Sequence, residues 1–177
     1  MRHSRLLAFL TAPLLLLGGC AGVTPDVYAT EKPVLDLYEY FDGRVDAWGY
    51  FADRSGKVVR RFTVTIEGSK RDDALELDEH FTYADSTTSR RVWTIHRTGA
   101  HTYTGTAGDV IGLAQGRAYG NALQWNYRLA FEVDGRTYHV NFDDWMYLQD
   151  ATVMLNHSVM SKFGVRLGEV VLAFRKA

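Results

Sequence analysis

Apolar and polar residues alternate with a period of two through most of this chain, and this pattern restricts its fold more than any other feature. Phe62, Val64 and Ile66 share one face of a predicted strand, and the residues between them are threonines. Similar runs surround Leu77 and Tyr127. Turn-forming residues separate these runs, and no long helical period lies between them. The sequence therefore predicts an all-β chain.

The spacing of the turns predicts about nine or ten strands in an antiparallel meander. Closure of this meander into a barrel removes its exposed edges. A barrel of this strand number has an interior wide enough for a small ligand. The alternative is a two-sheet sandwich, whose apolar faces fill each other and leave no cavity. Residues 35–41 predict a short helical segment before the first strand.

The first residues have the features of a lipoprotein signal. Two arginines and a histidine begin the chain, an apolar run continues to Leu17, and two glycines precede Cys20. The run is shorter than the about 20 residues of a membrane-spanning helix. We therefore expect a signal peptide over residues 1–19 and a lipid on Cys20, which is the sole cysteine. The alternative is an ordinary secretory signal followed by a cysteine that carries no lipid.

A lipidated Cys20 places the protein at a membrane surface, because two or three acyl chains hold a domain there. Ala21 follows it, where an aspartate is typical of retention in the inner membrane. We therefore expect a lipoprotein of the outer membrane of a Gram-negative cell that faces the periplasm. Residues 20–33 hold two prolines and few apolar side chains, which predicts a flexible tether. Residues 34–177 then form a single barrel domain.

The charge balance argues against a nucleic-acid partner. The chain has 20 basic and 21 acidic residues, and no basic run offers a stripe that neutralises phosphates. The histidines lack the spacing of metal ligands, and no Gly-x-Ser-x-Gly elbow is present. We therefore expect no nucleic acid, cofactor or metal, and the sequence assigns no catalytic residue.

Four charged residues fall on strand faces that are otherwise apolar: Arg60, Glu79, Arg91 and Asp144. A single charge in such a place is costly, so the four should form pairs or contact water. If the hairpins are centred on the polar turns, Glu79 lies opposite Trp93 and Arg91 lies on the diagonal. One interpretation is an ion-pair network that fixes the strand register, or a β-bulge that turns Asp144 outward.

The second interpretation is a polar floor in an aromatic cavity, where Arg60 or Arg91 binds a carboxylate or phosphate head group. Aromatic residues on the inward faces supply the apolar wall of such a pocket, although a filled core uses them equally well. The candidate ligand-binding residues are Arg60, Glu79, Arg91, Trp93, Trp125, Tyr127, Phe142 and Asp144.

A resemblance to a known family rests on six segments, namely residues 48–51, 53–62, 90–93, 105–110, 142–148 and 160–164. Through them the chain resembles the uncharacterised bacterial lipoprotein family catalogued as domain of unknown function 3833. The resemblance implies a lipoprotein without an established activity. The family's association with gene clusters that modify fatty acids implies a fatty-acid-like or other lipid ligand.

The architecture is also similar to that of lipocalins, which are small barrels that bind small molecules. Lipocalins pack an arginine of the last strand across a tryptophan of the first. Trp48 and Arg175 stand at comparable ends of this chain, but the usual Gly-x-Trp spacing is absent. The resemblance implies a lipocalin-like barrel, while an ordinary core tryptophan and a solvated arginine remain the alternative.

Three functions are consistent with these observations. The first is the binding of an apolar or amphipathic small molecule, and an aromatic cavity would distinguish it from the others. The second is a structural or assembly role in the cell envelope, with a filled barrel and a partner on its outer surface. The third is an enzyme acting on a lipid with the inward carboxylates as acid and base, which a raised carboxylate pKa beside a roomy pocket would favour.

Overall fold

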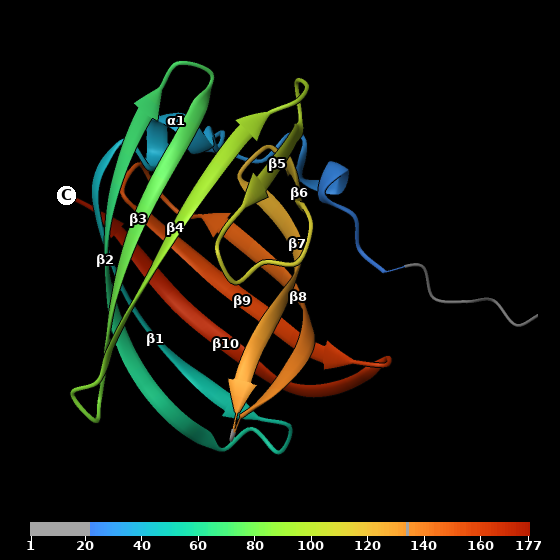
Figure 1. The fold of residues 1–177 in the computed structure, drawn as a ribbon. Helices are drawn as coiled ribbons and strands as arrows, with labels where there is room; N and C mark the ends of the chain where they lie inside the picture. The colour runs from blue at the N-terminus through green and yellow to red at the C-terminus, as the bar shows by residue number, and fades with distance from the viewer. Residues whose placement is uncertain (1–21, 134) are drawn as a thin grey trace, which may run out of the picture.

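Ten antiparallel strands form one closed barrel in this computed structural model, which describes residues 22–133 and 135–177 (Figure 1). The strands follow one another around the barrel in chain order, and the first pairs with the last. They are β1 (Gly43–Asp53), β2 (Val58–Arg71), β3 (Ala74–Tyr83), β4 (Thr88–Arg97), β5 (Thr102–Thr106), β6 (Ala114–Tyr119), β7 (Ala122–Val133), β8 (Arg136–Leu148), β9 (Val153–Lys162) and β10 (Val165–Lys176). The predicted all-β barrel is confirmed, and the sandwich alternative is wrong.

The alternation in the sequence becomes an alternation of burial across the barrel wall. On β2, Phe62, Val64 and Ile66 are buried, while Thr63 between them is exposed. Because successive side chains of a strand point to opposite faces, each strand places one row inside the barrel. The inward rows form one continuous hydrophobic core.

The predicted helical segment is the single turn α1 (Leu37–Tyr40). Asp36 caps it, because its Oδ1 accepts a hydrogen bond of 2.9 Å from the backbone N–H of Tyr38. Leu37 and Phe41 are buried against the barrel core. A helix this short is not stable alone, so its packing on the barrel holds it in place.

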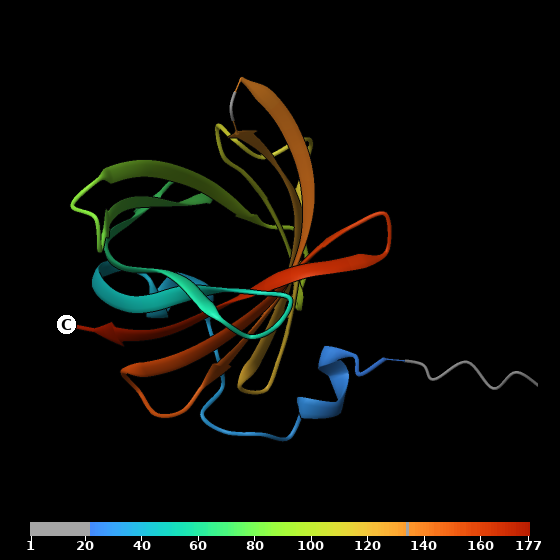
Figure 2. The same cartoon turned by 90° about the horizontal axis from the view of Figure 1, so that it is seen from below.

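Hydrogen bonds fix α1 across one end of the barrel. The Tyr38 hydroxyl donates to the carbonyl of Asp73 in the β2–β3 turn (2.9 Å), and the Tyr40 hydroxyl donates to the carbonyl of Thr152 in the β8–β9 turn (2.9 Å). Lys176 Nζ donates to three carbonyls of α1 and the turn after it, at 2.6 to 2.9 Å. This end is therefore closed. The turns after β1, β3, β7 and β9 lie at the opposite end, which Figure 2 views.

The segment before α1 contacts the outer wall of the barrel. It contains the 3-10 helix η1 (Pro25–Tyr28), in which Pro25 is buried. The Tyr28 ring packs edge-on against Trp145 and Tyr147 of β8, with ring centroids 6.2 and 5.4 Å apart. The prediction of a tether without packed residues is therefore wrong for residues 22–33. The expected signal peptide and Cys20 lie outside the described residues, and no described helix has the length and apolarity to cross a membrane.

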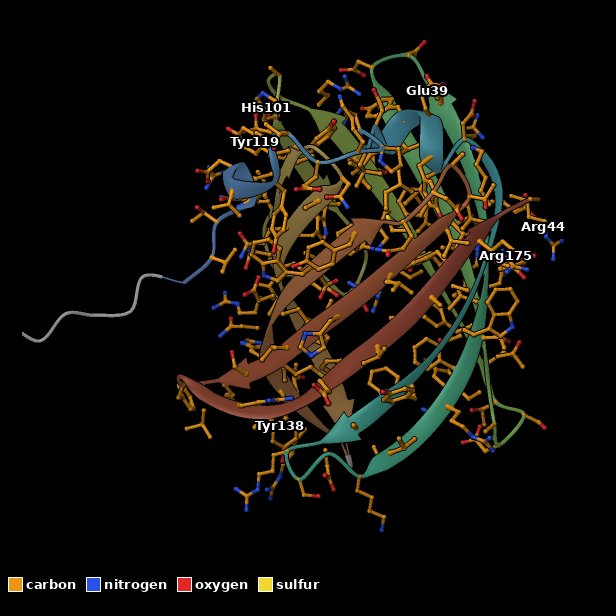
Figure 3. The ribbon with its side chains drawn as sticks, turned by 180° about the vertical axis from the view of Figure 1, so that it is seen from behind. Glu39, Arg44, His101, Tyr119, Tyr138 and Arg175 are labelled. Atoms are coloured by element: carbon orange, nitrogen blue, oxygen red, sulfur yellow. The ribbon has the colours of Figure 1, made fainter. Side chains whose placement is uncertain are left out.

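Trp48 and Arg175 do not form the lipocalin-type contact across the core. Ala47 is buried, so the next residue on β1 points outward, and Trp48 is 51% exposed. Arg175 is also exposed, on the outer surface near the C-terminus (Figure 3). This part of the lipocalin resemblance is wrong, because strand parity places both side chains outside the barrel.

Candidate functional site

The barrel encloses a cavity of about 280 Å³. Ligand pockets range from about 300 to 1,000 Å³, so this cavity is close to the lower limit and suits only a small molecule. Leu37 of α1 lines it at the closed end, and Ser89, which is exposed, lines it toward the other end. The cavity therefore reaches the surface away from α1. Its wall is mainly apolar, and its aromatic members include Phe51, Phe62, Phe81, Trp93, Trp125, Tyr127, Phe131 and Phe142.

The structure brings most of the predicted site residues together. Those that line the cavity are Glu79, Arg91, Trp93, Trp125, Tyr127, Phe142 and Asp144. They come from β3, β4, β7 and β8, and their side chains lie on the inner face of the barrel. A β-bulge at Asp144 is ruled out, since the β7–β8 pairing is continuous through this residue.

Arg60 is the exception, and its prediction as a cavity residue is wrong. It lies near the start of β2, where the pairing with β1 shifts beside Phe51 and Ala52. Its side chain is 42% exposed, with Nη2 3.0 Å from an Asp85 oxygen and the guanidinium 3.6 Å from the centre of the Tyr83 ring. The inward row of β2 begins at Phe62, so Arg60 belongs to the rim of the open end.

The pairing around Glu79 differs from the predicted register by two residues. Glu79 lies opposite Ile66 on β2 and directly opposite Arg91 on β4, whereas Trp93 lies opposite Leu77. A shift of two residues keeps every side chain on the same face. The predicted inward direction of Glu79 is therefore correct although its predicted partners were wrong.

Asp109 is the principal partner of Arg91. The Arg91 Nη2 lies 2.6 Å from Asp109 Oδ2, and Nε donates to both carboxylate oxygens at 3.0 and 3.1 Å. Asp109 stands in the β5–β6 loop, which a bridge between Val110 and Leu129 holds against β7. Burial lowers the pKa of the Arg91 guanidinium, but the negative charge of Glu79 and the hydrogen bonds to Asp109 have the larger combined effect. The pKa of Arg91 is therefore raised. Sequence reasoning missed Asp109 because it lies outside the alternating strands.

Glu79 lies in the cavity wall, and its interaction with the nearest positive charge is weak. Its side chain is 14% exposed, and the nearest Arg91 nitrogen, Nη1, is 3.9 Å from its Oε2, which is too long for a hydrogen bond. Burial raises the pKa of Glu79 to about 7, and the positive charge of Arg91 opposes this shift only partly. Asp109 and Asp144 add negative charge that favours the protonated form.

Asp144 is buried on the other side of the cavity. The Tyr127 hydroxyl donates to its Oδ2 at 3.1 Å, and Tyr127 itself stacks on Phe142 with ring centroids 5.0 Å apart. Burial raises the pKa of Asp144 to about 7, although the nearby Ser158 hydroxyl, the hydrogen bond from Tyr127 and the charge of Arg91 favour the ionised form. Within the described residues, Asp144 Oδ1 has no hydrogen-bond partner, and neither has the buried hydroxyl of Ser158 opposite it on β9.

The cavity therefore combines aromatic rings with a polar layer on its inner face. This layer consists of Glu79, Arg91, Asp109, Tyr127, Asp144, Asn156 and Ser158. Among residues 22–133 and 135–177, no group of histidine, aspartate or glutamate side chains is arranged to hold a metal ion. The site is suited to hydrogen bonding and proton exchange with a molecule whose body is apolar.

Three solved structures are similar to this chain. The S-type phycobiliprotein lyase CPES from Guillardia theta superposes with a TM-score of 0.54 at 5% identity, covering 79% of this chain and 90% of that chain. The redesigned β-barrel mFAP1 bound to DFHBI has a TM-score of 0.43 at 8% identity, with 78% and 97% of the two chains covered. The redesigned barrel b11L5F_LGL has a TM-score of 0.43 at 8% identity, with 79% of this chain and 94% of that chain covered. The first of these likenesses shows the fold alone.

No curated protein matches this sequence. A family match covers residues 14–176, which includes every strand of the barrel and the whole polar layer of its cavity. The match agrees with the resemblance of the six sequence segments. The chain therefore belongs to the family described as "Protein of unknown function (DUF3833)".

Proposed function

We propose that this protein binds a small apolar or amphipathic molecule inside its barrel. The observation that carries the proposal is the cavity of about 280 Å³ with an aromatic wall. A barrel with a purely structural role would be more stable if side chains filled this space, because residues that line an empty cavity lose van der Waals contacts. The apolar part of the ligand lies against the aromatic rings, and its polar group reaches the layer formed by Glu79, Arg91 and Asp144.

The proposal extends to the location of the protein. A lipid on Cys20 anchors the barrel at the outer membrane, facing the periplasm, as the sequence Leu17-Gly18-Gly19-Cys20 predicts. The ligand at such a place is a lipid-like or fatty-acid-derived molecule of the envelope.

The binding of decan-1-ol should change the intrinsic fluorescence of the purified protein, since Trp93 and Trp125 line the cavity. We expect Trp125→Ala to weaken binding about tenfold, equivalent to about 1.4 kcal/mol of lost contact. Trp48→Phe is the matched control, because Trp48 is 51% exposed on the outer wall and should contribute nothing to the response. A response that survives Trp93→Phe with Trp125→Phe but disappears with Trp48→Phe would place binding outside the barrel.

Membrane fractionation tests the anchor. Cys20→Ser should release the barrel into the soluble periplasmic fraction or leave an unprocessed precursor, because serine offers no thiol for the lipid. The wild-type protein should fractionate almost entirely with the membrane. A processed Cys20→Ser protein that stays in the membrane fraction would show that another part of the chain holds it there.

A second candidate function is acid–base chemistry on a bound lipid. The pKa values of about 7 for Glu79 and Asp144 favour it, because groups that titrate near neutrality exchange protons readily. Recovery of a bound molecule unchanged after prolonged incubation separates a binding protein from such an enzyme.

A further inference from the structure

We infer that the cavity selects molecules with a positively charged head group, such as a protonated amine on an apolar chain. The inference rests on the proposed function, since it names the chemical class of the molecule bound inside the barrel. It follows from which charged groups of the cavity already have partners and which do not.

Both arginines of the lining are already paired. Arg90 lies on the exposed side of β4, and its Nε and Nη2 bind the two oxygens of Asp78 at 2.7 and 2.9 Å. Arg91 faces the interior, and Asp109 holds it in a bidentate pair of which the shortest contact is 2.6 Å. Bidentate pairs of this kind are among the strongest in proteins. Asp109 occupies Nε and Nη2 of Arg91, so an anionic head group can reach only Nη1, which lies 3.9 Å from the Glu79 carboxyl group and its negative charge.

The remaining charged groups of the lining are carboxyl groups. Glu79 is 3.9 Å from Arg91 and makes no hydrogen bond to it at this distance. Asp144 is 6% exposed, lines the cavity, and uses only Oδ2 for its bond with Tyr127. A cation in the cavity therefore meets two acidic groups that no arginine fully neutralises, while an anion meets their repulsion.

An unpartnered pair of polar atoms marks where the head group binds. Asp144 Oδ1 and Ser158 Oγ are buried and face each other across the β8–β9 pairing, and in the described part of the chain neither makes a hydrogen bond of good geometry. The Ser158 hydroxyl is close enough to favour the charge of Asp144 but leaves room for a better donor. Ser158 is 2% exposed, so bulk water does not solvate it. An acceptor left unpaired in the interior is costly. An ammonium group carries three donors and satisfies both oxygens at once.

The chain of the ligand then has a defined direction. Tyr127 stands next to Asp144 and stacks on Phe142, and both rings line the cavity. Phe62 and Phe81 extend the aromatic wall toward the open end, with ring centroids 5.8 Å apart. We place the head group at Asp144, deep in the barrel, and the apolar chain along these rings.

Three probes with the same ten-carbon chain test the inference: decylamine, decan-1-ol and decanoate. Binding to the purified protein is measured at pH 8 by tryptophan fluorescence and by calorimetry. We expect decylamine to bind about tenfold more tightly than decan-1-ol, and decanoate about tenfold more weakly, as one close charge pair predicts. Equal affinities of decylamine and decan-1-ol, or tighter binding of decanoate, would overturn the inference and leave the proposed function standing. If none of the three binds, both fail.

Paired variants assign the selectivity to the interior. Asp144→Asn should remove most of the preference for decylamine while decan-1-ol still binds. Asp143→Asn is the matched control, because Asp143 is the next residue on β8, points to the outer wall and accepts a hydrogen bond of 2.7 Å from Gln124. The control should keep the full preference. Loss of the preference in Asp143→Asn but not in Asp144→Asn would place the amine site on the outer wall and overturn the inference.

Discussion

Replacement of Arg91 by methionine should lower the free energy of unfolding by about 3 to 5 kcal/mol. Methionine keeps most of the apolar stem but removes the guanidinium, so Asp109 loses its bidentate partner and Glu79 loses its nearest cation. Chemical denaturation monitored by circular dichroism measures the effect. The loss arises mainly at Glu79, because its side chain is 14% exposed and water solvates its charge poorly, whereas Asp109 is 38% exposed.

Arg60→Met is the control for this prediction. Its pair with Asp85 lies on the exposed rim, where the two side chains are 42% and 56% exposed, so the change should cost less than about 1 kcal/mol. The double variant Arg91→Met with Asp109→Asn should recover part of the stability lost in Arg91→Met. Equal effects of Arg60→Met and Arg91→Met would contradict the distinction between an interior pair and a rim pair.

The protein should become more stable as the pH falls from about 8 to about 5. Glu79 and Asp144 have ordinary pKa values of 4.5 and 3.8, and burial raises both to about 7 in the folded chain. Folding therefore takes up protons in this window, and the penalty for burying the ionised groups disappears as they are protonated. One pKa unit is about 1.4 kcal/mol, so each group should contribute a gain on the order of 2 to 3 kcal/mol across this window.

Below about pH 4 the dependence should reverse, because the Arg90 hydrogen bond lowers the pKa of Asp78, and protonation of Asp78 removes stability. Denaturation curves collected across this range give the profile. Glu79→Gln and Asp144→Asn should each flatten it between pH 5 and pH 8, whereas Asp143→Asn should change it much less, because Asp143 acts only as the last of the causes that raise the pKa of Asp144. A wild-type stability that stays constant from pH 5 to pH 8 would mean that both carboxyl groups keep their ordinary pKa values, and one that rises over this range would equally contradict the prediction.

The sequence predicted the face of most interior residues, since a period of two depends only on strand parity. Glu79, Arg91 and Asp144 were therefore placed inside the barrel correctly. An error of two residues in register does not change which face a side chain occupies. The predicted face of Glu79 was therefore correct although its predicted partner was Trp93 instead of Arg91. The prediction failed at Arg60, although this residue has the same parity as the inward residues of β2. The pairing of β1 and β2 is irregular there and the inward row ends at Phe62, so the Arg60 side chain is exposed.

Contacts between distant segments of the chain left no signal in the sequence. Asp109 belongs to a loop, and only the folded barrel brings it to Arg91, eighteen positions earlier in the chain. The unpaired oxygens of Asp144 and Ser158 likewise depend on the pairing of β8 with β9. Local periodicity describes a strand but not its neighbours, so the charge balance of the cavity required the structure.

The closure of one barrel end by α1 limits how a bound molecule can be exchanged. Tyr38, Tyr40 and Lys176 tie this helix to three separate parts of the rim, so a path along the barrel axis ends there. A ligand must leave the cavity through the same opening by which it enters. Under the proposed function, the protein is therefore suited to storing a molecule, or to collecting it from one donor and delivering it to one acceptor in turn, and not to conducting a continuous flow through its interior.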